Sequence, residues 1–122
     1  MRGCRLRACW FEPTFQNHAG KLCAGIQIHV DDPAYDHAAF RPWRLIALAF
    51  KATRKLRPNY KLWRDFPYEY ERGRLAIDLI NGSPLLREWV DDSAATAADL
   101  YALARPDEAA WREAREAVLL YR

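Results

Sequence analysis

The sequence predicts an α+β fold in which a small mixed sheet, drawn from the N-terminal two thirds, packs against one central helix and a C-terminal group of helices. Two observations predict the sheet: apolar and polar residues alternate near the N-terminus and again near residue 70. A third predicts the helices, because helical spacing of apolar residues begins near residue 40 and returns toward the C-terminus.

Length and composition are those of one globular domain, residues 1–122. The chain has 122 residues, 51% of them hydrophobic and 29% charged, which is enough to bury a core without disulfides or a structural metal. A net charge of +3 is mild, so attraction to a polyanion would need a local patch. Three cysteines leave at least one thiol unpaired, and no membrane span or signal peptide is visible.

Two strands are expected around a polar loop. Alternation predicts the first strand from Cys4 to Phe11 and the second from Ile26 to Val30, where Asp31-Asp32-Pro33 ends it. On the second strand Gln27 and His29 share the polar face.

The loop between these strands is rich in hydrogen-bonding side chains. It contains Thr14, Gln16, Asn17, His18 and Lys21, while Gly20 and Gly25 suit a tight turn or a close backbone approach. Two interpretations remain open. The loop and the polar strand face form a binding site in which His18 and His29 converge with Gln27, or they are an ordinary strand-loop-strand with a solvated polar face.

The central helix is predicted from Phe40 to Leu56. Its apolar stripe is Leu45, Leu48 or Ala49, Ala52 and Leu56. Another side carries the cations Arg44, Lys51, Arg54 and Lys55, and the basic surface continues through Arg57 and Lys61. A nucleic-acid contact is conceivable, but cations near a helix C-terminus are typical of a solvated face, and no RNP or zinc-finger pattern accompanies them. We therefore expect no nucleic-acid partner.

A further strand is predicted where tyrosine and glutamate alternate. In Tyr68-Glu69-Tyr70-Glu71, a strand would place both tyrosines on one face and both carboxylates on the other. A short apolar run, Leu75 to Ile80, follows and is closed by Asn81-Gly82.

Three helices are expected in the C-terminal part. Ser83 as N-cap and Pro84 as first helical residue predict a helix through Trp89, and a second follows from Ser93 to Ala104. The last helix is predicted to start at Pro106. Its buried stripe is Trp111, Ala114, Val118 and Tyr121.

Few side chains are spaced for catalysis. Cys23 with His18 or His29 offers a thiol beside a base, yet lone cysteines are mostly inert, and no paired metal-ligand spacing is present. Glu69 and Glu71 would fall within the range of a glycosidase pair if they shared a strand face, but nothing would bury either one. We assign no catalytic residue, no metal and no cofactor. The aromatic candidates for a ligand wall are those expected to border the polar loop: Trp10, Phe11, Phe15, Tyr68 and Tyr70.

Several motifs together resemble one family. They are F-x-P-T-F-x-x-H-A-G-K-x-C-x-G-[IV]-Q-I-H-V at 11–30, Ala39-Phe40-Arg41-Pro42, Pro67-Tyr68-Glu69-Tyr70-Glu71, Ile77-Asp78-Leu79-Ile80-Asn81-Gly82-Ser83 and Tyr121. The chain resembles the C-terminal domain of the NamZ-type exo-β-N-acetylmuramidases, a bacterial peptidoglycan-recycling glycosidase family first catalogued as a domain of unknown function. Glu12, Asn17 and Ala24 depart from the pattern.

The resemblance implies an accessory role. In that family a Rossmann-like N-terminal domain carries the catalytic glutamate, and we expect that domain to be absent from this chain. We therefore expect the chain to form one wall of a cleft for non-reducing-end N-acetylmuramic acid and to have little or no activity alone. The positions carried over as substrate contacts are Thr14, His18, Lys21, Gln27, His29 and Glu69.

The resemblance also implies partners and a location. The expected partners are the N-terminal catalytic domain and peptidoglycan fragments, and the chain is a candidate homodimer with no membrane contact. The parent protein would be secreted or periplasmic. Two alternatives stay open: a stand-alone carbohydrate-binding or protein-interaction module, and a hydrolase that uses Glu69.

Overall fold

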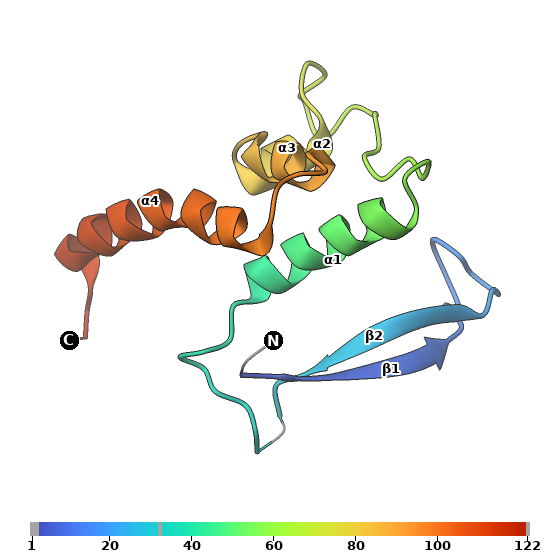
Figure 1. Cartoon of the computed structure of the whole chain (residues 1–122), viewed down its shortest axis with the longest axis horizontal. Coiled ribbons are helices and arrows are strands. Elements are labelled where there is room, and N and C mark those ends of the chain that lie inside the picture. Colours follow the sequence, from blue (N-terminus) through green and yellow to red (C-terminus); the bar gives the residue numbers. More distant parts are fainter. Residues whose placement is uncertain (1–2, 32, 122) are drawn as a thin grey trace. The chain divides into compact units, whose positions relative to one another are not determined.

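The computed structural model describes residues 3–31 and 33–121 and confirms the α+β class. Within them lie two strands, four α-helices and one short 3₁₀ helix, drawn in Figure 1. The chain divides into two compact units, Met1–Leu45 and Ile46–Arg122.

The first unit is built on an antiparallel hairpin of β1, Arg5–Phe11, and β2, Cys23–His29. The predicted first strand is confirmed to within one residue. The second begins three residues earlier than predicted, because Phe11, Trp10 and Cys9 pair with Cys23, Ala24 and Gly25. In the described residues this hairpin is the whole sheet.

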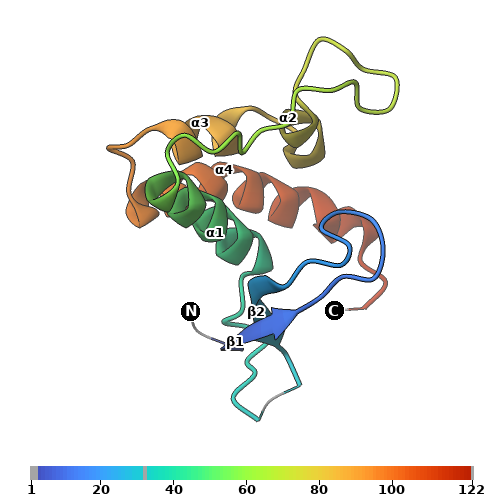
Figure 2. The ribbon, with the colours of Figure 1, turned by 90° about the vertical axis from the view of Figure 1, so that its right-hand side faces the viewer.

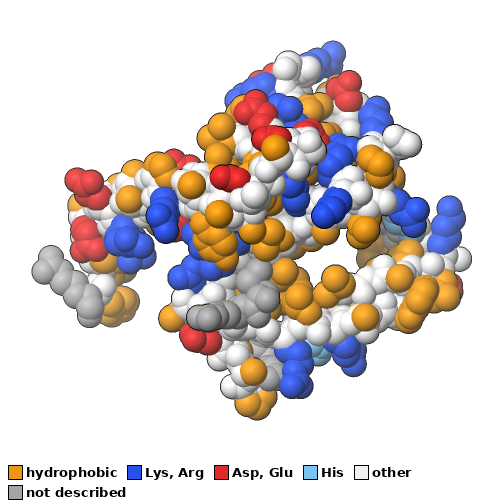
Figure 3. Space-filling model, viewed as in Figure 1, with side chains coloured by type: hydrophobic (Ala, Val, Ile, Leu, Met, Phe, Trp, Pro, Cys, Tyr) orange, Lys and Arg blue, Asp and Glu red, His pale blue; other side chains and the backbone are white. Residues whose placement is uncertain are grey.

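The hairpin register gives the sheet two unlike faces. Directly paired residues of an antiparallel sheet point to the same side, so Leu6 with Ile28, Ala8 with Ile26 and Trp10 with Ala24 form one apolar face. We call these six residues the apolar face. It is largely open to solvent, with Trp10 at 73% and Ile26 at 67% exposure. Figure 3 shows hydrophobic side chains at the surface along the hairpin.

The segment after the hairpin is fixed by a capping carboxylate. Asp36 Oδ1 accepts hydrogen bonds from the backbone amides of Ala38 at 2.9 Å and Ala39 at 3.2 Å. The backbone amide of Asp36 donates to the carbonyl of Gly3 at 3.2 Å, which ties this segment to the start of the first strand. The hairpin is therefore anchored at its open end.

The second unit is helical. Its helices are α1, Pro42–Leu56, which begins in the first unit, then α2, Ala76–Asn81, α3, Leu85–Asp91, α4, Ala97–Arg115, and the 3₁₀ helix η1, Glu116–Val118. Its core consists of Ala47, Leu86, Trp89, Val90 and Leu100. Figure 2 shows α1, α3 and α4 side by side, and these three helices supply that core.

The predicted apolar stripe of the central helix is right in part: Leu48 packs against the core, but Ala52 and Leu56 are exposed. The residue of α1 that is fully buried is Ala47, and Phe50 packs against the core. Lys51 and Arg54, expected to be solvated, are half-buried instead. Both cations bind groups on neighbouring segments, as described below.

The predicted strand Tyr68–Glu71 is a tight turn. The backbone amide of Glu71 donates to Tyr68 O at 3.0 Å, and the amide of Tyr68 donates to Glu71 O at 3.2 Å. Glu69 lies inside this turn at φ = +55°, in the left-handed region, and Tyr70 is fully exposed. Four residues of alternating chemistry are too few to distinguish a strand from a turn closed on itself.

The apolar run after this turn is helical. It forms most of α2, which ends at Gly82 with φ = +82°, a left-handed cap that glycine adopts at low cost. Arg87 on α3 donates to both carboxylate oxygens of Asp78 on α2, from Nε at 2.9 Å and Nη2 at 2.9 Å. This hydrogen bonding raises the pKa of Arg87 and joins the two short helices.

Two helices predicted in the C-terminal part are one. Helix α4 continues through Pro106, which was predicted to start a separate helix. The preceding helix α3 has Pro84 as its N-cap, one residue after the predicted cap Ser83. The Ala, Leu, Glu and Arg residues that neighbour Pro106 are strong helix formers, which favours a continuous helix despite the proline.

The predicted buried stripe of the last helix is wrong. Trp111 and Val118 are 65% and 71% exposed, and Tyr121 is exposed as well. The first half of α4 contributes Leu100 and Leu103 to the core, but the helix then runs past the elements of its own unit, as Figure 1 shows.

Candidate functional site

The second face of the hairpin is polar and is the best candidate for a binding surface. Arg5 pairs with His29 and Arg7 with Gln27, so these four side chains share it. We call them the polar face. Arg7 Nη2 donates to Gln27 Oε1 at 2.5 Å across the two strands.

His29 lies at one end of the polar face beside a carboxylate. Its Nδ1 atom is 3.3 Å from Asp31 Oδ1. Its Nε2 atom is buried and has no hydrogen-bond partner among the described residues. A contact between Nδ1 and a carboxylate favours the tautomer with the proton on Nδ1, which leaves Nε2 as an acceptor.

An aromatic ring closes the other end of this face. The ring of Phe11 lies over Gly25, where a Cβ atom would be only 2.7 Å from Phe11 Cε1. Glycine is therefore required for the ring to lie across β2. The ring is half-exposed and offers a flat apolar surface on the side where the arginines lie.

The loop between the strands is compact but exposed. Its backbone is closed by hydrogen bonds from Gly20 N to Pro13 O at 2.9 Å and from Lys21 N to His18 O at 3.0 Å. His18 adopts φ = +62°, an uncommon conformation for a residue with a Cβ atom. The side chains of Thr14, His18 and Lys21 are exposed, so the loop presents donors to solvent.

The structure brings together some of the residues predicted for the site. Gln27 and His29 share one face of β2, while Thr14, His18 and Lys21 belong to the connecting loop. Glu69 belongs to the other unit and stands alone in an exposed turn.

Sequence reasoning missed Arg7. The signal was present in the alternation of the first strand, but its pairing with Gln27 depends on the strand register. Register is set by loop length and turn geometry, which the sequence does not show directly.

The carboxylate of Glu71 is fixed in place by hydrogen bonds from the residues that follow it. It accepts hydrogen bonds from the backbone amides of Gly73 at 2.7 Å and Arg72 at 3.0 Å, and from Arg74 Nη2 at 3.1 Å. The amide of Gly73 lowers the pKa of Glu71 most, followed by Arg74. A general acid needs a raised pKa, and Glu69 and Glu71 share no strand face, so the structure does not support this pair as glycosidase carboxylates.

Two basic residues of α1, Lys51 and Arg54, form hydrogen bonds within the helical unit. Lys51 Nζ donates to carbonyls at the end of α3, at 2.7 Å for Trp89, and Arg54 Nε donates to Asp91 Oδ1 at 2.8 Å. Trp63 Nε1 binds the second oxygen of Asp91 at 2.7 Å. A hollow of about 600 Å³ lies beside these cations, and two of the three lysine and arginine side chains that line it are used in this way.

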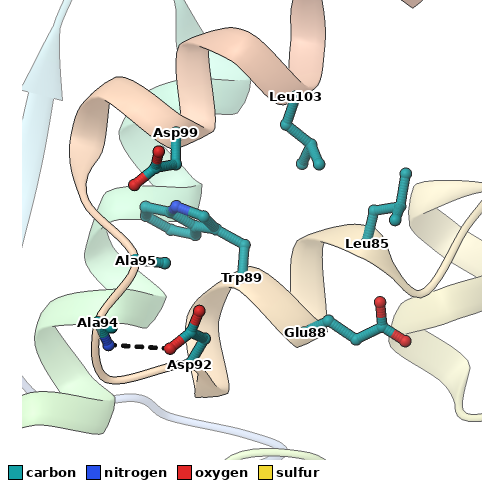
Figure 4. A pocket seen from close by; sticks show the side chains of 8 residues that line it. All are labelled: Leu85, Glu88, Trp89, Asp92, Ala94, Ala95, Asp99 and Leu103. Carbon is teal, nitrogen blue, oxygen red and sulfur yellow. Dashed lines mark hydrogen bonds between the residues drawn. The ribbon is translucent and has the colours of Figure 1, made fainter.

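A second hollow, of about 490 Å³, lies between α3 and α4 (Figure 4). Trp89 lines it, and Leu85 and Leu103 point toward one another across it. Two of its three carboxylates cap backbone: Asp92 accepts from Ala94 N at 2.9 Å, and Asp99 accepts from Thr96 N and Oγ1, both at 2.7 Å. The bonds from Thr96 lower the pKa of Asp99.

Two kinds of site are not found among residues 3–31 and 33–121. No three His, Cys, Asp or Glu side chains gather there in a group that could hold a metal ion. None of the described helices is both long and apolar enough to cross a bilayer.

Fold and site together define a small α+β domain whose hairpin presents a polar face. The sequence model of the family described as exo-β-N-acetylmuramidase NamZ, C-terminal, matches residues 1–121. The chain belongs to this family, and the resemblance seen in the sequence motifs is confirmed. No curated protein and no solved structure matches the chain.

Proposed function

We propose that this chain is the accessory domain of a peptidoglycan-degrading exo-β-N-acetylmuramidase. In this proposal it forms one wall of the cleft that holds a non-reducing-end N-acetylmuramic acid residue, and a separate N-terminal domain supplies the catalytic glutamate. The observation that carries the proposal is the two-sided hairpin, with hydrogen-bonding and cationic groups on one face and apolar groups on the other.

The polar face matches the chemistry of the sugar. N-acetylmuramic acid carries a lactyl carboxylate, an acetamide and hydroxyl groups, which require cations, donors and acceptors. Gln27 and His29 offer donors and acceptors beside arginine, and the ring of Phe11 lies on the same face. The proposed substrate contacts are Thr14, His18, Lys21, Gln27, His29 and Glu69.

The apolar face is consistent with an interface to the catalytic domain. A two-stranded hairpin is marginally stable in water unless its apolar side is covered. Exposed apolar patches of this kind commonly mark protein–protein contacts, and the family description places this domain C-terminal to another part of the enzyme.

An alternative is a stand-alone module that binds carbohydrate or another protein. The exposure of Trp10 and Phe15 favours it, because flat aromatic side chains stack on sugar rings without help from a second domain. The two functions predict different changes in hydrolytic activity when the chain is mixed with a catalytic domain.

The test measures release of N-acetylmuramic acid from a chromogenic muramide. The assay uses this chain alone, the N-terminal catalytic domain of a family member alone, and both together. Activity that rises on mixing supports the accessory function. Activity of the chain alone would point to Glu69, and no gain on mixing would favour the stand-alone module.

Matched variants identify the surface involved. Gln27→Ala and His29→Ala should reduce the gain on mixing, while Lys55→Ala, an exposed cation of the helical unit, should leave it unchanged. Equal effects of all three would contradict a cleft wall built by the hairpin.

A further inference from the structure

We infer that Arg7 is the carboxylate-binding residue of the polar face and that it distinguishes sugars bearing a lactyl carboxylate from those that lack one. This inference rests on the proposed function, because it names a specificity group of the same surface. The juxtaposition that carries it is the contact between Arg7 and Gln27 across the two strands.

The guanidinium group of Arg7 is oriented by one hydrogen bond and keeps other donors available. Its Nη2 atom donates to Gln27 Oε1 at 2.5 Å, and that bond takes one of the five N–H donors of a guanidinium group. The side chain is exposed, so its remaining donors face solvent. A planar guanidinium with two parallel donors available binds a carboxylate in a bidentate manner.

The charge around Arg7 suits an anion. Arg5 is two residues away on the same face, and Asp31 contacts His29 at 3.3 Å. No carboxylate is bonded to Arg7 among the described residues, in contrast to Arg54, Arg74 and Arg87, which each bind one. Arg7 therefore differs from the arginines that have structural partners.

Arg7 is a better candidate than Lys21 for this role. Lys21 extends from an exposed loop, and an ammonium group is a point charge that fixes no orientation. Arg7 extends from a paired strand and is oriented by Gln27, so less side-chain freedom is lost when a carboxylate binds. Gln27 acts in this proposal as a positioning residue for Arg7.

The experiment is a titration of the 122-residue chain, followed by NMR amide shifts, with N-acetylmuramic acid and separately with N-acetylglucosamine. The expected result is tighter binding of N-acetylmuramic acid, with shifts in both strands. Arg7→Gln should weaken that binding by roughly tenfold and leave N-acetylglucosamine unchanged, as expected for one charge-assisted hydrogen-bonded pair. Arg7→Lys should restore part of the loss, because the charge returns without the planar fork.

Two variants serve as controls. Lys55→Gln removes one positive charge from an exposed position of the helical unit, away from the proposed contacts, and should keep the preference for N-acetylmuramic acid. Gln27→Glu places a carboxylate beside Arg7, so it should lower the affinity for N-acetylmuramic acid selectively. Unchanged amide spectra away from the hairpin would show that each variant is folded.

Several outcomes would overturn the inference. They are an undiminished preference in Arg7→Gln, a preference lost in Lys55→Gln instead, or equal binding of the two sugars by the unmodified chain. Absence of binding by either sugar would also overturn it.

The mixing assay separates this failure from failure of the proposed function. If the unmodified chain and Arg7→Gln stimulate the catalytic domain equally on the muramide, the accessory function stands and the role of Arg7 fails. If the unmodified chain gives no stimulation, the accessory function fails, and the sugar preference of the chain still tests Arg7 by itself.

Discussion

The Nζ atom of Lys51 lies 2.7 Å from the carbonyl oxygen of Trp89 and 4.9 Å from the centre of its indole ring. Nζ also donates to the carbonyls of Val90, at 3.4 Å, and Asp92. The last carbonyls of a helix have no partner within the helix, and an ammonium group has three donors to offer. Lys51 therefore closes the C-terminal end of α3 from the neighbouring helix α1.

Replacing this lysine should destabilise the helical unit. Lys51→Met keeps most of the side-chain volume but leaves three carbonyls without their donor, so we expect the free energy of unfolding to fall by about 1–3 kcal/mol. The measurement is urea unfolding followed by circular dichroism. Lys55→Met, an exposed position on the same helix, is the matched control and should change stability little. Equal losses in the two variants would contradict the capping role.

Leu100 is completely buried between the helices and should be among the most sensitive core positions. Leu100→Ala removes buried methyl groups and leaves a cavity, which typically costs about 2–5 kcal/mol. Leu120 is 89% exposed, so Leu120→Ala should cost far less in the same unfolding assay. Comparable losses would mean that the C-terminal residues are covered in solution.

The cap at the start of α4 should make stability depend on acidity. Hydrogen bonds from Thr96 lower the pKa of Asp99 from its ordinary 3.8, so its carboxylate is favoured in the folded state. This stabilisation is present above the unfolded pKa and is lost as the pH falls through the lower folded value.

The measurement is the free energy of unfolding between neutral and acid pH. Asp99→Asn should lower stability at neutral pH and flatten the decline at low pH. Asp107, an exposed carboxylate of the same helix, gives the control variant Asp107→Asn, which should retain the full acid-dependent decline. A decline that is unchanged in Asp99→Asn would assign the acid sensitivity to other carboxylates.

Local patterns predicted the elements with long and regular signals. The strand ending at Phe11 and the helix ending at Leu56 were found because each carries a repeat over several residues. The family resemblance was confirmed for the same reason, since its motifs extend over nearly the whole chain.

The errors come from contacts that are distant in the sequence. The sequence predicts the buried face of α1 only in part. Lys51 and Arg54 bind groups about forty residues further along, and local sequence shows them only as cations on a helix. Arg7 was missed because only the strand register places it beside Gln27. Local preference favours proline at a helix start, whereas Pro106 lies inside a longer helix.

The apolar face should make the isolated chain self-associate. Its six residues carry no charge, so two copies related by a two-fold axis bring no like charges together when these faces meet. Ile26→Glu places a carboxylate on the face and should shift the chain to monomer in sedimentation velocity over a range of concentrations. Gln27→Glu adds the same charge to the opposite face of the same strand and should leave association unchanged. If the unmodified chain stays monomeric at every concentration, this face is not a self-association surface, and its cover would then be sought in the catalytic domain by repeating both variants in the mixture.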